Sequence, residues 1–134
     1  MPRSQAAEQP APARPPGALP AHVPPSVRTA LADAAGRLRE AYGERLRRVV
    51  LYGSFARGEA TPESDVDVLV VLDGFEENRY RELKRTGTAW GDLLERYGLS
   101  LSFHLYTEKE YQTQGGPFMH NVREEGIELP QRLT

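Results

Sequence analysis

The sequence predicts an α/β (or α+β) domain in which a small mixed β-sheet is flanked by helices. Apolar residues at helical spacing fill residues 26–42, and two short β-branched runs follow at residues 45–52 and 65–73. A second helical stretch over residues 78–98 leads into a strictly alternating run at residues 99–107. The order helix, strand, turn, strand, helix, strand is typical of an α/β sandwich. The last connection leaves the third strand free to run parallel or antiparallel to the second.

The first half of the domain shows clear element boundaries. Pro25 precedes the helix expected over residues 26–42 and Gly43 follows it, which matches the usual asymmetry of helix ends. The segment "RLRRVVLY" predicts a strand that ends before Gly53, and "SFARGEA" predicts a short helix or turn. The run "DVDVLVVLD" is apolar on both faces after its first residues, which indicates a central strand covered on both sides.

The second half contains one interrupted helix, a strand and a closing helix. Asn78 can cap the helix expected over residues 78–98, while Gly87 and Gly91 favour a kink or break within it. In residues 99–107 leucine and phenylalanine alternate with polar side chains, which predicts a strand with one apolar face. The last segment, residues 117–130, predicts a short helix that stops at Gly126, followed by a brief extended piece. The aromatic residues of the long helix are expected in the core: Tyr80, Trp90 and Tyr97.

Composition narrows the class of protein. The chain has 134 residues, a net charge of −2 and no cysteine, which excludes disulfides, thiolate zinc sites and a cysteine nucleophile. No apolar run approaches the ~20 residues of a membrane span, and the weak net charge gives no strong nucleic-acid signal. Eight of the eleven prolines lie in residues 1–25, so we expect a disordered tail there and one domain over residues 26–134. These features fit a cytoplasmic protein without a membrane partner.

Asp65 and Asp67 raise the main chemical question. They are two residues apart at the start of an apolar strand, so both carboxylates are expected on one face. Two unpaired carboxylates this close repel each other, and a divalent cation removes the conflict. Oxygen ligands of this kind suit Mg²⁺ or Mn²⁺, and Mg²⁺ commonly takes one or two carboxylates together with substrate phosphates.

The turn after the first strand offers the complementary site for an anion. Gly53 lets the backbone approach a ligand closely, and Ser54 with the neighbouring amides can hold phosphate oxygens. Arg57, one turn later, can add positive charge to the same phosphates. The sequence lacks the P-loop and dinucleotide-binding glycine motifs. Two alternatives stay open: an Arg57–Asp65 ion pair of structural value only, or a D-x-D pair that has no ligand.

These residues resemble the nucleotidyltransferase superfamily typified by DNA polymerase beta, in particular its small bacterial members, the minimal nucleotidyltransferases. The resemblance rests on Gly53-Ser54, on Arg57-Gly58 and on the segment "SDVDVLV" that begins at Ser64. It implies a polymerase beta-like fold that transfers a nucleoside monophosphate from a nucleoside triphosphate, with ATP as the expected donor. Gly53, Ser54, Arg57 and Ser64 would then bind the nucleotide, and Asp65 and Asp67 would bind the catalytic metals.

One departure from the family pattern concerns the third strand. Active relatives usually carry a third carboxylate there, whereas this chain offers Ser102 and His104 on the polar face and Glu108 just beyond it. His104 lies nearest the expected position and its neutral imidazole can act as a general base near pH 7. The alternatives are a half-exposed His104 without a role, and a module that binds nucleotide or a partner but no longer catalyses.

The resemblance also suggests partners. About 110 residues leave no room for an added acceptor-binding domain, so the acceptor site is expected from a second subunit or another protein. Minimal members of this family often pair with a small helical protein of the HEPN type in toxin–antitoxin modules. In such a pair the nucleotidyltransferase is the antitoxin, and it can modify its HEPN-type toxin with AMP.

Overall fold

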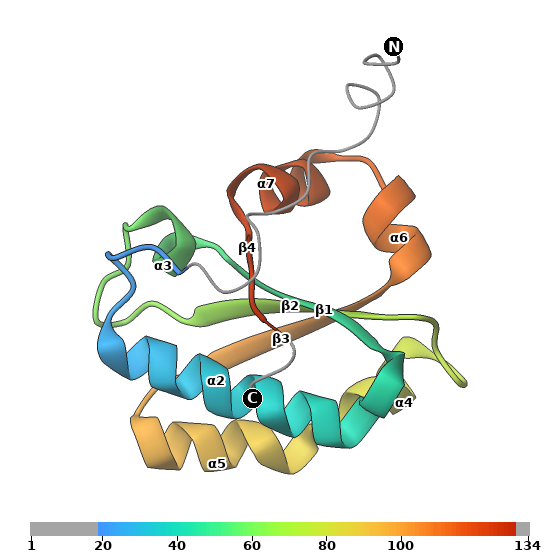
Figure 1. The fold of residues 1–134 in the computed structure, drawn as a ribbon, viewed down its shortest axis with the longest axis horizontal. Helices are drawn as coiled ribbons and strands as arrows, with labels where there is room; N and C mark the ends of the chain where they lie inside the picture. Colours follow the sequence, from blue (N-terminus) through green and yellow to red (C-terminus); the bar gives the residue numbers. More distant parts are fainter. Residues whose placement is uncertain (1–18, 131–134) are drawn as a thin grey trace.

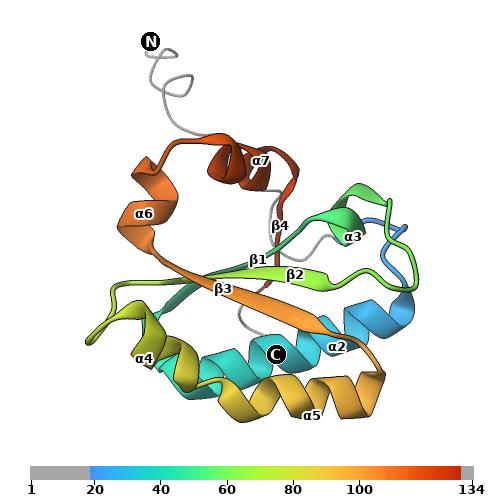
Figure 2. The same ribbon diagram turned by 180° about the vertical axis from the view of Figure 1, so that it is seen from behind.

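In the computed structural model, which describes residues 19–130, one mixed sheet carries helices on both faces (Figure 1; Figure 2 gives the reverse view). The strands are β1 (Leu46–Tyr52), β2 (Val66–Leu72), β3 (Leu101–Thr107) and β4 (Ile127–Glu128), in the order β3-β2-β1-β4. β1 is antiparallel to β2 and β4, whereas β2 and β3 are parallel. The predicted mixed sheet is therefore confirmed, and the third strand takes the parallel orientation.

The helices form two layers. In Figure 1, α6 and α7 lie above the sheet, α2, α4 and α5 lie below it, and α3 stands at the end of β1. Their bounds are α2 (Pro25–Tyr42), α3 (Ser54–Arg57), α4 (Arg79–Lys84), α5 (Gly87–Tyr97), α6 (Glu108–Thr113) and α7 (Pro117–Glu125), with a 3-10 turn η1 at Gly43–Arg45.

Strand alternation divides the core between the two faces of the sheet. One set of apolar side chains from β1, β2 and β3 packs against α2 and α5. On the other face, a smaller cluster combines side chains of β1 and β2 with side chains of α6 and α7: Val50, Tyr52, Leu69, Val71, Tyr111, Met119 and Val122. Asp67 lies two residues before Leu69 and therefore shares the α6–α7 face. Its cross-strand partners in register are Tyr52 on β1 and Ser102 on β3.

The helices of the second half match the sequence prediction only in part. The break predicted within residues 78–98 divides α4 from α5 just before Gly87, where Thr86 Oγ1 donates to the Leu83 carbonyl and accepts from Trp90 Nε1. The division breaks the expected apolar stripe, so the prediction that Tyr80 is a core residue is wrong: it is 66% exposed. α6 was not predicted, although Thr107 and Glu110 form a capping box at its start.

The packed chain begins before the predicted domain boundary at residue 25. Val23 is only 1% exposed and belongs to the core under α2. His22 Nε2 forms a hydrogen bond of 3.0 Å with the Ala56 carbonyl of α3. The rest of the predicted tail, residues 1–18, lies outside the described residues. None of the helices in the described range is long and apolar enough to cross a membrane.

Candidate active site

Gly53 and Asp67 bring the two halves of the sequence motif into contact. Gly53 follows β1 with φ at +82°, a conformation that side chains rarely tolerate. A Cβ atom at Gly53 would lie 2.3 Å from Asp67 Oδ2, well inside van der Waals contact. The carboxylate of Asp67 therefore occupies the space that a side chain at position 53 would need. The turn after β1 and the start of β2 form one continuous surface.

The short helix α3 places the phosphate-binding candidates beside that contact. Ser54 opens α3 and is partly exposed, and the first amides of a helix have no partner within it. Gly58 ends α3 in the left-handed conformation, with φ at +78°. α3 thus stays short, and the chain turns back towards β2.

The acidic pair lies at the border between solvent and the core. Asp65 is exposed and precedes β2, while Asp67 within β2 is partly buried. Burial raises the pKa of Asp67, and the charge of Asp65 adds to that increase, whereas His104 and Arg57 act in the opposite direction. The ionised form of Asp67 is therefore short of compensating positive charge in the protein alone.

This charge shortage fits a divalent cation. Among the described residues no group of three His, Asp or Glu side chains is close enough to hold a metal ion. Two carboxylates nevertheless match Mg²⁺, which completes its coordination shell from phosphate oxygens and water. Asp65 and Asp67 would hold the ion.

Arg57 does not pair with Asp65, so the structure does not support that alternative. Its Nε donates to Glu59 at 2.9 Å and its Nη1 donates to Glu125 of α7 at 3.0 Å. Arg57 is exposed, and its charge still lowers the pKa of Asp67. A ligand phosphate would have to compete with two carboxylates for this guanidinium group.

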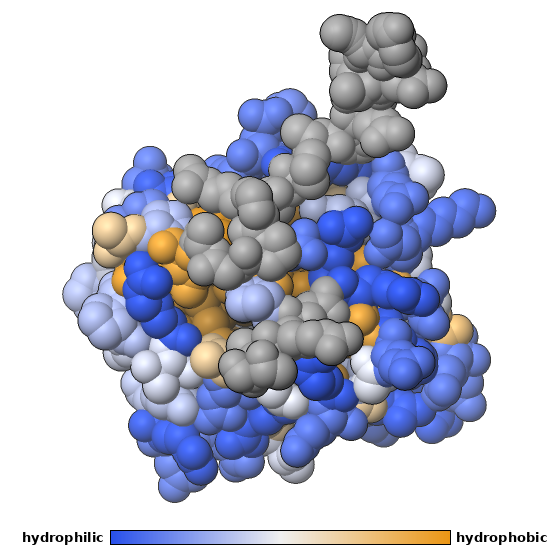
Figure 3. Space-filling view, viewed as in Figure 1, coloured by the Kyte–Doolittle hydropathy of each residue, from blue (hydrophilic) through white to orange (hydrophobic). Residues whose placement is uncertain are grey.

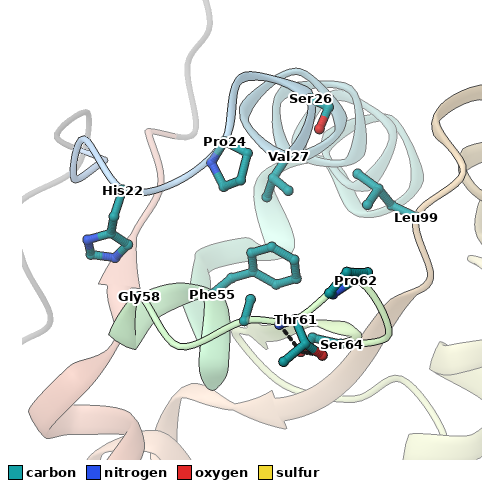
Figure 4. A pocket seen from close by; sticks show the side chains of 11 residues that line it. His22, Pro24, Ser26, Val27, Phe55, Gly58, Thr61, Pro62, Ser64 and Leu99 are labelled. Carbon is teal, nitrogen blue, oxygen red and sulfur yellow. Dashed lines mark hydrogen bonds between the residues drawn. The ribbon is translucent and has the colours of Figure 1, made fainter.

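Ser64 faces a different hollow. Its hydroxyl accepts a hydrogen bond of 2.8 Å from the Thr61 amide, inside the loop before β2 (Figure 4). It lines a pocket of about 330 Å³ with Phe55, Pro62 and residues at the start of α2. The described lining does not include Asp65, Asp67 or His104. Figure 3 shows an apolar area near α3 on an otherwise largely hydrophilic face.

His104 lies on the α6–α7 face of β3, in register with Leu69. Tyr52 reaches across β2 from β1, and its Oη lies 2.8 Å from His104 Nδ1. Phe118 of α7 packs edge-on against Tyr52, with ring centroids 5.5 Å apart, and lies 6.4 Å from the His104 ring. Tyr106 stacks on Phe118 at 6.0 Å. We call the side chains of Tyr52, His104, Tyr106 and Phe118 the aromatic wall.

The sequence identified only part of this arrangement. The structure brings Gly53, Asp67 and His104 to one face of the sheet, with Asp65 and Ser54 at its edge. It leaves the Ser64 hydroxyl in its own loop. Sequence reasoning missed the aromatic wall apart from His104. The position of Tyr52 directly before Gly53 could have marked it as a site residue. Its contact with His104 could not be predicted, because it depends on the strand order.

The chain is similar in sequence to known proteins. Residues 31–113 match the family model described as "Nucleotidyltransferase domain". A Methanocaldococcus jannaschii protein named "Putative protein adenylyltransferase" is 30% identical over 98 residues, which cover 72% of this chain and 91% of the relative. A second protein of that name and organism is 32% identical over 66 residues, 49% of this chain and 45% of the relative.

The chain is also similar to a solved structure. It is described as a crystal structure of a "putative nucleotidyltransferase" from Sulfolobus solfataricus. It is 22% identical, has a TM-score of 0.42, and the alignment covers 70% of this chain and 80% of that one.

Proposed function

Because this chain belongs to the nucleotidyltransferase domain family, we propose that it transfers AMP from ATP to a hydroxyl group of a protein acceptor. The observation that carries the proposal is the contact between Gly53 and Asp67, which joins an anion-binding turn to an acidic pair. A nucleoside triphosphate with a divalent cation supplies both complementary charges. The choice of a protein acceptor is supported by the names of the two M. jannaschii relatives.

Each predicted site residue has a place in this proposal. The amide groups around Gly53 and Ser54 bind the β- and γ-phosphates, and Arg57 contributes charge once it leaves Glu125. Asp65 and Asp67 hold Mg²⁺ or Mn²⁺, which when bound stabilises the attacking and leaving oxygens of an in-line displacement. Ser64 acts indirectly, because its hydrogen bond to Thr61 shapes the loop that leads to Asp65.

The sheet order supports separate positions for the phosphates and the acceptor on the two sides of the acidic pair. β2 lies between β1, which leads into Gly53, and β3, which carries Ser102 and His104. If phosphates bind on the β1 side, the acceptor hydroxyl approaches from the β3 side. There its oxygen bonds to the α-phosphorus, the bond from that phosphorus to the bridging oxygen breaks, and pyrophosphate leaves with the electron pair. The hydroxyl proton is released to a base or to solvent.

A second candidate function is a module that binds nucleotide or a partner without catalysis. The observation that favours it is the absence, among the described residues, of a third acidic side chain beside Asp65 and Asp67. His104 stands on the strand where family members usually carry that acid. The two candidates differ in turnover and agree in nucleotide binding.

The test is a transfer assay with ATP labelled at the α-phosphate, in the presence of Mg²⁺ or Mn²⁺. Acceptors are the protein itself and helical partner proteins of the HEPN type, which the family resemblance suggests. The variant Asp65→Asn/Asp67→Asn is expected to lose label transfer completely. Asp73→Asn is the matched control, because it makes the same carboxylate-to-amide change at the opposite end of β2.

The outcomes separate the candidates. Label on an acceptor that disappears only in the double variant supports the transferase. Metal-dependent ATP binding by calorimetry, without transfer to any acceptor, favours the binding module. No ATP binding with either metal would refute both.

A further inference from the structure

The hydrogen bond between Tyr52 and His104 determines what the imidazole can do. Tyr52 is only 8% exposed, and burial, together with the charge of Asp67, raises the pKa of its hydroxyl. The phenol therefore keeps its proton. The one hydrogen-bond partner found for Tyr52 Oη among the described residues is His104 Nδ1, at 2.8 Å.

A buried hydroxyl proton needs an acceptor, because an unpaired buried donor costs about 1–3 kcal/mol. Nδ1 is that acceptor only when it carries no hydrogen of its own. In the neutral ring the hydrogen then lies on Nε2. His104 is exposed, and the described residues give its Nε2 no hydrogen bond, so this N–H is available to a ligand.

Packing fixes the ring in this orientation. Phe118 contacts the Tyr52 ring at right angles and also faces the His104 ring, so α7 holds the pair against the sheet. The ring centroids of Tyr52 and His104 are 6.1 Å apart. The pair spans β2 beside Asp67, with Tyr52 on β1 and His104 on β3, the side proposed for the acceptor.

We propose that Tyr52 is a positioning residue that holds His104 as a hydrogen-bond donor, with Nε2–H directed at an oxygen of the transferred phosphate, and not as a general base. The inference rests on the proposed function for the identity of that oxygen. It assigns this chain a neutral donor on the strand where relatives usually carry a third acid. A preorganised donor of this kind stabilises charge that develops during the transfer.

The first test measures the imidazole nitrogens directly. Long-range ¹H–¹⁵N correlation spectra at about pH 8, where an ordinary imidazole is neutral, report which nitrogen of His104 is protonated. We expect hydrogen on Nε2, and a shift of the Nδ1 resonance in Tyr52→Phe as the hydrogen bond is lost. Tyr111→Phe is the matched control, because the hydroxyl of this buried tyrosine of the same core has no hydrogen-bond partner among residues 19–130. Hydrogen on Nδ1, or an unchanged Nδ1 resonance in Tyr52→Phe, overturns the inference.

The second test measures turnover. Tyr52→Phe is expected to lower kcat by about tenfold at unchanged KM for ATP, a part of the ~10²–10³-fold effect of one donor. Tyr111→Phe is expected to match the wild type. His104→Gln, which keeps an N–H donor, is expected to retain more activity than His104→Leu, whereas equal losses would indicate a base and contradict the donor role. If the wild type transfers no nucleotide, the proposed function fails, and the nitrogen resonances still decide the inference.

Discussion

At the residue scale, the contact between Gly53 and Asp67 sets the tightest steric limit on the site. Gly53→Ala would place a methyl group on the carboxylate, 2.3 Å from Oδ2, in a backbone conformation that alanine rarely adopts. We expect a loss of about 1–3 kcal/mol in the free energy of unfolding. Nucleotide binding should weaken as well, because the turn must move away from β2. Urea unfolding and ATP calorimetry measure the two effects.

Gly36→Ala provides the control for this change. Gly36 lies inside α2, and an added Cβ would meet nothing within 4 Å. Alanine in a helix interior is expected to stabilise the protein by about 0.5–1 kcal/mol and to leave ATP binding unchanged. Equal behaviour of the two variants would show that the space at Gly53 is not limiting.

Some residues of the site can be predicted from their neighbours in the sequence, and others only from the tertiary arrangement. The placement of Asp65 and Asp67 beside the Gly53-Ser54 turn could be predicted, because it follows from their spacing along the chain between two strands. The partner of His104 could not, because the Tyr52 hydroxyl reaches it only through the order of β1, β2 and β3. Pairings of that kind depend on tertiary arrangement, which periodicity does not encode.

At the element scale, α3 and α7 are linked by the ion pair between Arg57 and Glu125. Glu125→Gln removes one of the two carboxylates that compete with phosphate for Arg57. We therefore expect this variant to bind ATP more tightly than the wild type. The increase in affinity should be smaller at high salt, because the Arg57 guanidinium group is exposed and its charge is screened. Calorimetric titration at low and high ionic strength measures it.

Glu124→Gln is the matched control for that experiment, because it makes the same change at an exposed position one residue earlier in α7. We expect its ATP affinity to equal that of the wild type. A gain of the same size in both variants would point to general charge reduction. Unchanged affinity in Glu125→Gln would show that Arg57 does not reach the phosphates.

Element prediction succeeded where local rules operate. α2 begins at Pro25 and ends before Gly43, and Asn78 Oδ1 accepts from the Arg81 amide at the start of α4, as expected. The exact end of α4 could not be predicted, because the hydrogen bonds of Thr86 that mark it depend on neighbouring side chains. α6 was missed although its capping box, "TEKE", stands in the sequence. The capping box is visible in the sequence, but α6 follows β3 without an intervening loop, so the segment was not recognised as a separate helix.

At the scale of the whole molecule, the buried carboxylate of Glu82 connects α4 to the turn before β1, which are not linked through the hydrogen bonds of the sheet. Glu82 of α4 is 1% exposed, and it contacts Arg45 from the turn before β1 and Arg85 after α4. Its Oε2 also accepts from the Glu76 amide at 2.7 Å. The Tyr42 hydroxyl donates to its backbone carbonyl at 2.6 Å, which ties the end of α2 to the same point.

This network predicts how global stability changes with pH. Burial acts to raise the pKa of Glu82, but the Glu76 amide and the two arginines outweigh it, and the net pKa lies below the usual 4.5. A carboxyl group whose pKa is lowered by folding stabilises the native state fully above its unfolded pKa. That contribution is lost as the pH falls through the lower, folded value.

Glu82→Gln should therefore destabilise the protein by about 1–3 kcal/mol near neutral pH, because two arginines lose their shared carboxylate. The difference from the wild type should begin to shrink as the pH falls below about 4.5, where the unfolded wild-type chain takes up this proton. It should disappear once the pH has fallen through the lower pKa of the folded protein, where the native carboxyl group is protonated as well. Urea unfolding between about pH 3 and 7 measures this, with Glu77→Gln at an exposed position in the loop just before α4 as the control. A difference that stays constant across this range would mean that Glu82 acts through packing. Its charge would then have no part in joining α4 to the turn before β1.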